Sequence, residues 1–192
     1  MVEYSMRFPG FKTKAVTLSY DDGTVFDREM IRILNKYGIK CTFNLNSNSL
    51  GKGRCVSKEE VSSLYKGHEV AVHTFTHPHL NALSSGGIAL QIVRDRELLE
   101  SLTGSIVKGM AYPFGLSDES IIDTVKACGI NYARTTSSTL DFSLPKDYLR
   151  WNPTCYHAHE KTDELIEKFF EKEDTDHPWR IRLKVFYMYG HS

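Results

Sequence analysis

The chain has 192 residues, of which 41% are hydrophobic and 25% are charged, so its composition is that of a folded globular protein rather than a disordered one. Lysine plus arginine and aspartate plus glutamate both number 24, which gives a formal net charge of zero. This balance argues against nucleic acid as the main partner, because phosphate binding usually leaves a basic excess. The length predicts a single domain over residues 1–192.

Neither a membrane span nor a secretory leader is indicated by the pattern of apolar residues. No apolar run approaches the roughly 18 residues that a membrane helix needs. Residues 1–10 lack a basic region followed by an apolar one, so we expect a cytoplasmic protein, or a secreted or cell-wall protein whose leader has been trimmed. The four cysteines form no CxxC pair and are expected to be isolated, mostly buried thiols.

Segments typical of strands and of helices alternate along the chain. Strands are predicted at residues 14–20, 39–44, 69–72, 107–112, 131–134, 148–151 and 184–189. Helices are predicted to follow a cap at Asp27, to follow a capping box formed by Ser57 and Glu60, and to cover residues 88–102, 117–128 and 162–170.

Strands that alternate with helices predict right-handed βαβ units and a parallel sheet. Seven strands fit either an incomplete barrel or an open doubly wound sheet. In both architectures the ligand meets the chain at the carboxyl ends of the strands. Residues that directly follow predicted strands are therefore the first candidates for chemistry.

Two acidic residues follow the first predicted strand. Asp21 and Asp22 are adjacent and precede Gly23. Consecutive side chains on an extended segment point in different directions, so one carboxylate can bind a metal while the other acts beside it. Taken alone, the Asp-Asp-Gly sequence favours a turn or a helix N-cap over a metal site.

Two histidines follow the third predicted strand. His73 and His77 are four positions apart, so their rings can converge on one cation if the segment turns. The residue after the first histidine is Thr74 rather than the glutamate of an HExxH motif, so a base must come from Asp21 or Asp22. Two histidines and one carboxylate leave open coordination positions, as in catalytic zinc sites and in non-haem iron sites. The alternating strands and helices favour zinc-type hydrolysis.

With these residues the chain resembles the polysaccharide deacetylases of the NodB-homology type, carbohydrate esterase family 4. Residues 18–24 are similar to the family's Thr-Phe-Asp-Asp-Gly motif, and residues 73–77 to its His-(Ser/Thr)-x-x-His motif. Residues 113–115 match the Pro-(Tyr/Phe)-Gly motif, and residues 185–191 match a late strand that ends in a histidine. The motifs occur in the family's order and span nearly the whole chain.

The resemblance implies an α/β fold, a distorted (β/α)7 barrel, and a metal-dependent hydrolase that removes acetyl groups from N-acetylated polysaccharides or oligosaccharides. It implies one divalent metal held by Asp22, His73 and His77, most simply zinc, with other divalent transition metals open. Asp21 would be the general base and His191 the general acid that protonates the departing amine.

The same resemblance implies that the backbone N–H of Phe114 stabilises the oxyanion. The family usually has an arginine two places before the proline of the third motif, where this chain has Ala111. Arg134, at the end of the next predicted strand, is the candidate to supply that charge. The family's fourth motif has no clean match, and Trp151 and His157 are the candidates to line the site.

A catalytically weak carbohydrate-binding relative that keeps the fold and the metal is the alternative hypothesis. Ala111 favours it, and so does the place of His191 one residue before the end of the printed sequence, where strands tend to fray. The presence of both Asp21 and Asp22 favours the enzyme, because metal binding alone needs only one carboxylate.

Overall fold

A computed structural model describes residues 6–172 and 182–192. Its strands and helices, in chain order, are β1 (Lys14–Asp21), α1 (Asp27–Lys36), β2 (Thr42–Leu45), α2 (Lys58–Leu64), β3 (Glu69–Val72), α3 (Ser85–Thr103), β4 (Gly109–Ala111), α4 (Glu119–Ala127), β5 (Tyr132–Arg134), β6 (Cys155–Tyr156), α5 (Thr162–Phe170) and β7 (Lys184–His191). The seven strands form one sheet in the order β5-β4-β3-β2-β1-β7-β6.

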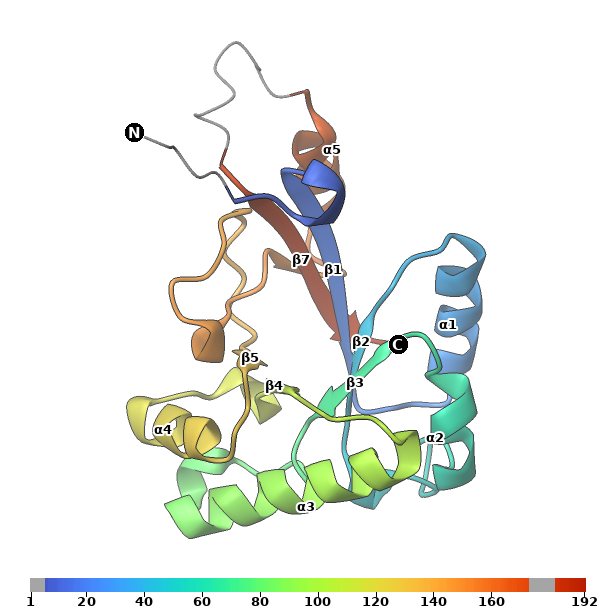
Figure 1. Cartoon of the computed structure of the whole chain (residues 1–192), viewed down its shortest axis with the longest axis vertical. Helices are drawn as coiled ribbons and strands as arrows, with labels where there is room; N and C mark the ends of the chain where they lie inside the picture. The colour runs from blue at the N-terminus through green and yellow to red at the C-terminus, as the bar shows by residue number, and fades with distance from the viewer. Residues whose placement is uncertain (1–5, 173–181) are drawn as a thin grey trace.

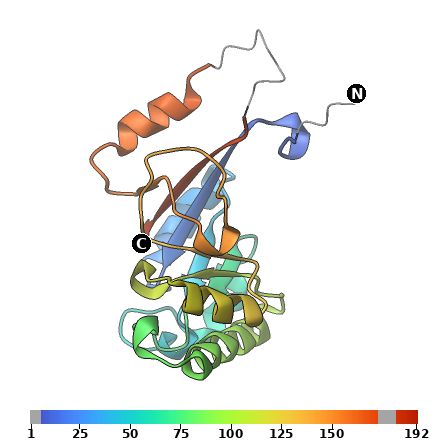
Figure 2. The ribbon, with the colours of Figure 1, turned by 90° about the vertical axis from the view of Figure 1, so that its left-hand side faces the viewer.

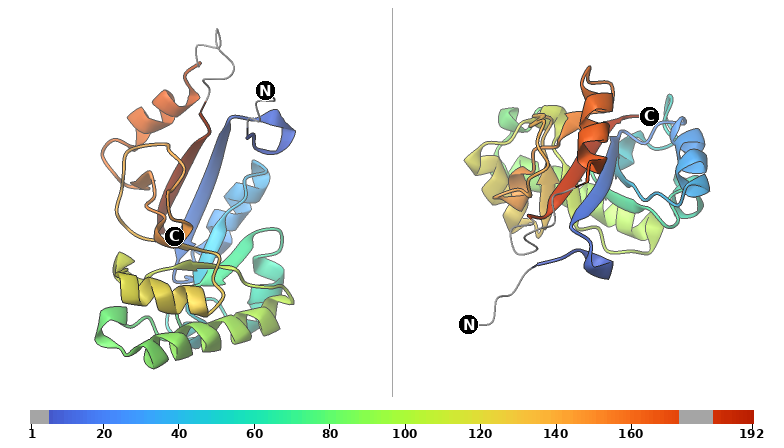
Figure 3. Two further views of the ribbon diagram at one scale, coloured as in Figure 1. Left: turned by 60° about the vertical axis from the view of Figure 1, so that its left-hand side comes forward. Right: turned by 90° about the horizontal axis from the view of Figure 1, so that it is seen from above.

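Every neighbouring pair in this sheet is parallel, as the alternating elements predict. The sheet curls into a half-barrel, in agreement with the barrel that the resemblance implies. In Figure 1, α1 and α2 lie to the right of the sheet, α3 runs beneath it and α4 lies to the left, so these helices follow the curl. Figure 2 shows α5 beside the upper part of β7, far from α3 and α4. The view from above in Figure 3 places β1 and β7 between α1 and the long connection that follows β5.

Local sequence signals explain where several elements begin and end. The capping box predicted for α2 is present, and the Ser57 N–H donates to Glu60 Oε2 at 2.9 Å. Helix α3 turns Ile92 and Leu99 into the core and ends at Gly104, whose φ of 67° only glycine adopts readily. These two signals set where α2 begins and where α3 ends.

The main core lies between the sheet and helices α1 to α4. It includes fully buried side chains of β2, β3, α2, α3 and α4, among them Phe43, Leu45, Val72, Val61, Ile92, Leu99 and Val125. A smaller cluster under α5 comprises Phe142, Cys155, Leu165, Phe169 and Phe186. All four cysteines are free, and two of them are buried. Within the described ranges no helix has the length and apolar character to cross a membrane.

One predicted strand is wrong. Residues 148–150 form a 3₁₀ turn, Tyr148–Arg150, and Trp151 contributes only an isolated bridge to Arg134. The sixth strand is instead Cys155–Tyr156, which pairs with β7. Two residues are too few to show a strand pattern in the sequence, so tertiary pairing with β7 decides the conformation.

The predicted cap at Asp27 is also wrong. Phe26 already has helical angles, φ −73° and ψ −17°, and Asp27 is the first residue of α1. Its carboxyl group is fully buried and accepts a hydrogen bond from the Tyr65 hydroxyl at 2.6 Å. The helical backbone conformation begins one residue earlier than the capping rule predicts. As a result, the Asp27 side chain points into the core instead of capping the helix.

Candidate metal centre

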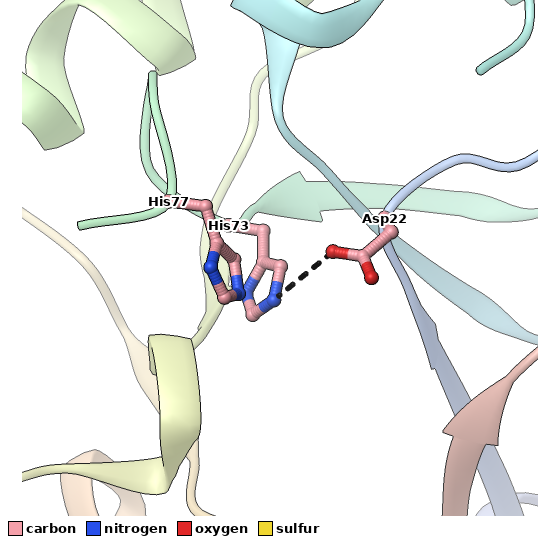
Figure 4. Close-up of side chains that lie close together, drawn as sticks. All are labelled: Asp22, His73 and His77. Carbon is pink, nitrogen blue, oxygen red and sulfur yellow. Dashed lines mark ion pairs between the residues drawn. The ribbon is translucent and has the colours of Figure 1, made fainter. Parts of the chain in front are cut away.

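Three side chains from two separate segments converge at the carboxyl ends of β1 and β3. Ligand atoms of Asp22, His73 and His77 all lie within 4.8 Å of one another. His73 Nε2 is 3.7 Å from Asp22 Oδ1, the pair joined by the dashed line in Figure 4. His73 is buried, whereas Asp22 is partly exposed, so the cluster opens toward solvent on one side.

The loops bring these groups together through uncommon backbone conformations. Asp22, Thr74 and His77 have φ values of 77°, 69° and 53°, in the left-handed region that residues with a Cβ seldom adopt. The Asp22 N–H donates to the Asn44 carbonyl at 3.0 Å, and the Asn46 side-chain amide donates to the Thr74 carbonyl at 2.9 Å. Side chains and backbone of the β2 end thus hold both ligand loops.

The surroundings of the two histidines suit metal ligation. His73 Nδ1 is 2.8 Å from the carbonyl oxygen of Ala111, which can only accept, so Nδ1 donates a proton there and Nε2, on the side of Asp22, is the nitrogen left to bind a metal. Burial and the neighbouring His73 lower the pKa of His77, which favours its neutral, ligating form. Two imidazole nitrogens and a carboxylate form a donor set that fits a divalent cation of the zinc type.

Asp21 stands beside this cluster in a buried ion pair. It is 3% exposed, and Arg134, at 0% exposed, places Nη2 2.6 Å from its Oδ1 and 2.5 Å from its Oδ2. The Asn44 side-chain amide donates to Oδ1 at 2.8 Å. Burial alone would raise the pKa of Asp21, but the Arg134 guanidinium and then His73 outweigh it and lower that pKa. The carboxylate is therefore ionised at neutral pH.

Arg134 reaches Asp21 from the strand next to the one that carries Ala111. The β4–β5 register pairs Ala111 with Arg134. The guanidinium lies over the Tyr189 ring, whose centroid is 4.6 Å from its central carbon. The structure thus pairs the arginine named from the sequence with the catalytic aspartate expected from the resemblance.

His191 and Phe114 border the same cluster. The β1–β7 register pairs His191, the last residue of β7, with Asp21, and its Nε2 lies 3.6 Å from Asp22 Oδ2. Phe114 is 51% exposed as a residue, and its ring meets the His77 ring edge-on, with centroids 4.6 Å apart.

Two residues named from the sequence lie elsewhere. Trp151 packs edge-on against the rings of Tyr132, Tyr148 and Tyr187. His157 lies over Gly190, where a Cβ would overlap its ring, and its Nδ1 is 3.2 Å from the Tyr20 hydroxyl. Neighbouring residues of a strand lie on opposite faces of the sheet. The face of β7 that His157 covers at Gly190 is therefore opposite to the face on which His191 approaches Asp22. In the described part of the chain no hydrogen bond, ion pair or ring contact joins either residue to Asp22, His73 or His77, although burial and then His191 lower the pKa of His157.

Sequence reasoning missed Asp95, which supports the histidine loop from α3. It is fully buried and accepts hydrogen bonds from the Ser47 N–H at 2.7 Å and the His73 N–H at 3.0 Å. Burial raises the pKa of Asp95 to about 7. A signal was available, because Asp95 lies on the same helical stripe as the apolar Ile92 and Leu99, where an acidic residue needs a buried partner.

The sequence of the chain matches a known family over most of its length. Residues 9–133 match the family described as polysaccharide deacetylase, a range that includes Asp21, Asp22, His73, His77 and Phe114 and stops just before Arg134. A chitin deacetylase of Pestalotiopsis sp is 26% identical over 131 residues, covering 68% of this chain and 44% of that protein. The chain spans 38–54% of the lengths of the first three curated relatives that it matches.

Solved structures share the fold. The Streptococcus pyogenes deacetylase PplD in complex with acetate superposes with a TM-score of 0.76 at 19% identity, over 86% of this chain and 74% of that one. A family 4 carbohydrate esterase pseudoenzyme from Bacillus anthracis superposes with a TM-score of 0.58 at 19% identity, over 94% of this chain and 56% of that one. The same fold therefore occurs in a deacetylase and in a pseudoenzyme.

Proposed function

The chain belongs to the polysaccharide deacetylase family, and on this basis we propose that it is a metal-dependent hydrolase that removes acetyl groups from N-acetylated sugars. One observation carries the proposal: Asp21, a second carboxylate that the metal cluster does not need, is held ionised beside Asp22 and His73 by the buried Arg134. A binding protein that only retained a metal would gain nothing from this buried charge pair, which is costly to desolvate.

We propose one divalent cation, most simply zinc, on Asp22, His73 and His77. When bound, the cation would lower the pKa of a coordinated water toward about 7 and polarise the acetyl carbonyl. The open side of the cluster, beside the partly exposed Asp22, is where substrate would enter.

Asp21 would accept the proton of the attacking water. Its Oδ2 lies 4.0 Å from His73 Nε2, so it reaches the space in front of the ligands without being one of them. Arg134 keeps this carboxylate ionised and fixed in direction, which a general base requires before the attack.

Phe114 and His191 would stabilise the charges that develop on the acetyl oxygen and on the departing sugar nitrogen. The N–H of Phe114 would donate to the oxyanion that develops from the acetyl carbonyl. His191, exposed and close to Asp22, would protonate the sugar nitrogen as the C–N bond breaks, because an amide anion is too poor a leaving group to depart unprotonated.

A polymer or oligomer of N-acetylglucosamine is the substrate class that we propose. The support is the chitin deacetylase among the relatives and the half-exposed aromatic ring of Phe114 at the rim of the cluster, a surface on which a sugar ring can pack. Acetate release from a chitin oligomer is therefore the first assay.

The test compares the wild type with Asp21→Asn and Asp22→Asn after removal of metal and addition of zinc. Wild type is expected to release acetate only with zinc. Asp21→Asn should bind about one zinc per chain while turnover falls roughly 10²–10⁴-fold, the usual worth of a general base. Asp22→Asn should bind zinc weakly. Zinc binding by the wild type without acetate release would favour the carbohydrate-binding alternative, which the structural likeness to a pseudoenzyme supports.

A further inference from the structure

A third histidine of the loop after β3 has no role in the proposed reaction. His79 lies two residues beyond His77, and its imidazole stacks on the phenyl ring of Phe114 with centroids 4.0 Å apart and planes 9° apart. The same phenyl ring meets the edge of His77. The loop after β3 and the turn after β4 therefore touch at the edge of the cluster through one stacked and one edge-on ring contact.

The backbone of Phe114 is held in an uncommon conformation. Its φ and ψ are 59° and 9°, in the left-handed region. The next residue, Gly115, packs so tightly on Thr136 that a Cβ there would overlap it. This contact fixes one side of the turn, and the ring contacts with His79 and His77 fix the other.

The N–H of Phe114 is available to a ligand. In the two described ranges no protein group accepts a hydrogen bond from it, although the neighbouring Gly115 N–H donates to the Tyr112 carbonyl at 2.9 Å. If residue 114 relaxed to a right-handed conformation, this peptide group would turn relative to the cluster. The ring contacts that hold the Phe114 side chain therefore also set the direction of its free backbone N–H.

We infer that His79 is a positioning residue for this N–H: its ring covers the Phe114 ring and keeps residue 114 in the left-handed conformation that presents the N–H to the acetyl oxygen. The inference rests on the proposed function. The backbone beneath the imidazole is itself fixed, because Leu80 is fully buried and the His79 carbonyl accepts the Ala82 N–H at 3.1 Å. Ring stacking requires an aromatic plane but no titratable nitrogen. A phenylalanine at position 79 should therefore support the Phe114 ring as histidine does.

The experiment compares His79→Ala and His79→Phe with a control, Tyr37→Ala, which removes an exposed ring at the far end of α1. Three quantities are measured: kcat and KM for acetate release from a chitin oligomer, the affinity for zinc, and the affinity of the zinc-loaded protein for acetate. Loss of a whole oxyanion donor costs roughly 10²–10³-fold in kcat, so a misdirected donor in His79→Ala should cost about 10-fold or more. Acetate affinity should fall with kcat, KM and zinc affinity should stay near the wild-type values, and His79→Phe should restore both kcat and acetate affinity. The control should match the wild type.

Three results would overturn the inference. His79→Ala with wild-type kcat would show that the stack directs nothing. His79→Phe as impaired as His79→Ala would mean that the imidazole nitrogens, and not the ring plane, matter. Loss of zinc affinity in His79→Ala would mean that the ring supports His77 instead.

A wild type that releases no acetate would count against the proposed function alone. Acetate affinities would then still decide the role of His79. Wild type and His79→Phe binding acetate more tightly than His79→Ala would support it, and equal affinities would contradict it.

Discussion

At the scale of single residues, the two adjacent aspartates differ through their surroundings. Asp21 is buried against Arg134, whereas the side chain of Asp22 is 38% exposed and faces His73 and His191. Since β1 ends between them, Asp21 belongs to the strand and points into the half-barrel, and Asp22 turns away with a φ of 77°. The end of β1 therefore separates a charge-paired carboxylate from the carboxylate proposed to bind the metal. The left-handed backbone of Asp22, rather than the side-chain alternation of an extended strand, makes this separation.

The Asp21–Arg134 pair should show strong coupling in a double-mutant cycle. Arg134→Met leaves the buried Asp21 carboxylate without its partner, which should lower the free energy of unfolding by about 3–5 kcal/mol. Asp21→Asn with Arg134→Met removes both charges, and its loss should be smaller than the sum of the two single losses by about 0.5–3 kcal/mol. Urea denaturation of the metal-free wild type, the two single variants and the double variant measures the four free energies of unfolding in the cycle. Additive losses would mean that the two groups do not stabilise one another.

At the scale of elements, strands and helices whose signals are local are the ones that the sequence predicts well. Strand β3 begins and ends where the sequence predicts, and α5 likewise covers Thr162–Phe170. Strand β6 escapes prediction because its two residues are extended only through pairing with β7. The start of α1 differs from the prediction because burial of Asp27 against Tyr65 overrides its capping preference.

The buried first residue of α1 makes a pH prediction. Burial, only partly offset by the Tyr65 hydrogen bond, raises the pKa of Asp27 from 3.8 to about 6. Because the folded chain holds this proton more tightly than the unfolded chain, Asp27 stabilises the fold below pH 4, and that contribution is lost as the pH rises through about 6.

Asp27→Asn keeps an acceptor for Tyr65 but cannot ionise. Relative to the wild type, its free energy of unfolding should therefore increase between pH 4 and pH 7 by up to about 3 kcal/mol, because each tenfold difference in proton affinity between the folded and unfolded chains is worth about 1.4 kcal/mol. Urea denaturation of both proteins across this range measures the difference, in which all other titrating groups cancel. A difference that stays constant with pH would contradict the raised pKa.

At the scale of the whole molecule, the alternating strands and helices predict a parallel sheet. The ordered motifs along the chain indicate the family, and the resemblance to that family implies the barrel. The sequence does not predict how Arg134 reaches Asp21, since that contact depends on the register of β4 against β5 across the sheet interior. The support of His73 by Asp95 is likewise a contact between a helix and a loop far apart in sequence. The motif pattern therefore does not predict side-chain contacts between residues that lie far apart in the sequence.

The position of the bound metal is the sharpest test of the proposed site. A crystal of the zinc-loaded protein, measured by anomalous diffraction at the zinc edge, should show one peak per chain. We expect His73 and His77 nitrogens at about 2.0–2.1 Å from it, an Asp22 oxygen at about 2.0–2.2 Å, at least one position left open, and Asp21 unligated on Arg134. A peak at another site, or His73 and His77 directed away from a common centre, would contradict the assignment.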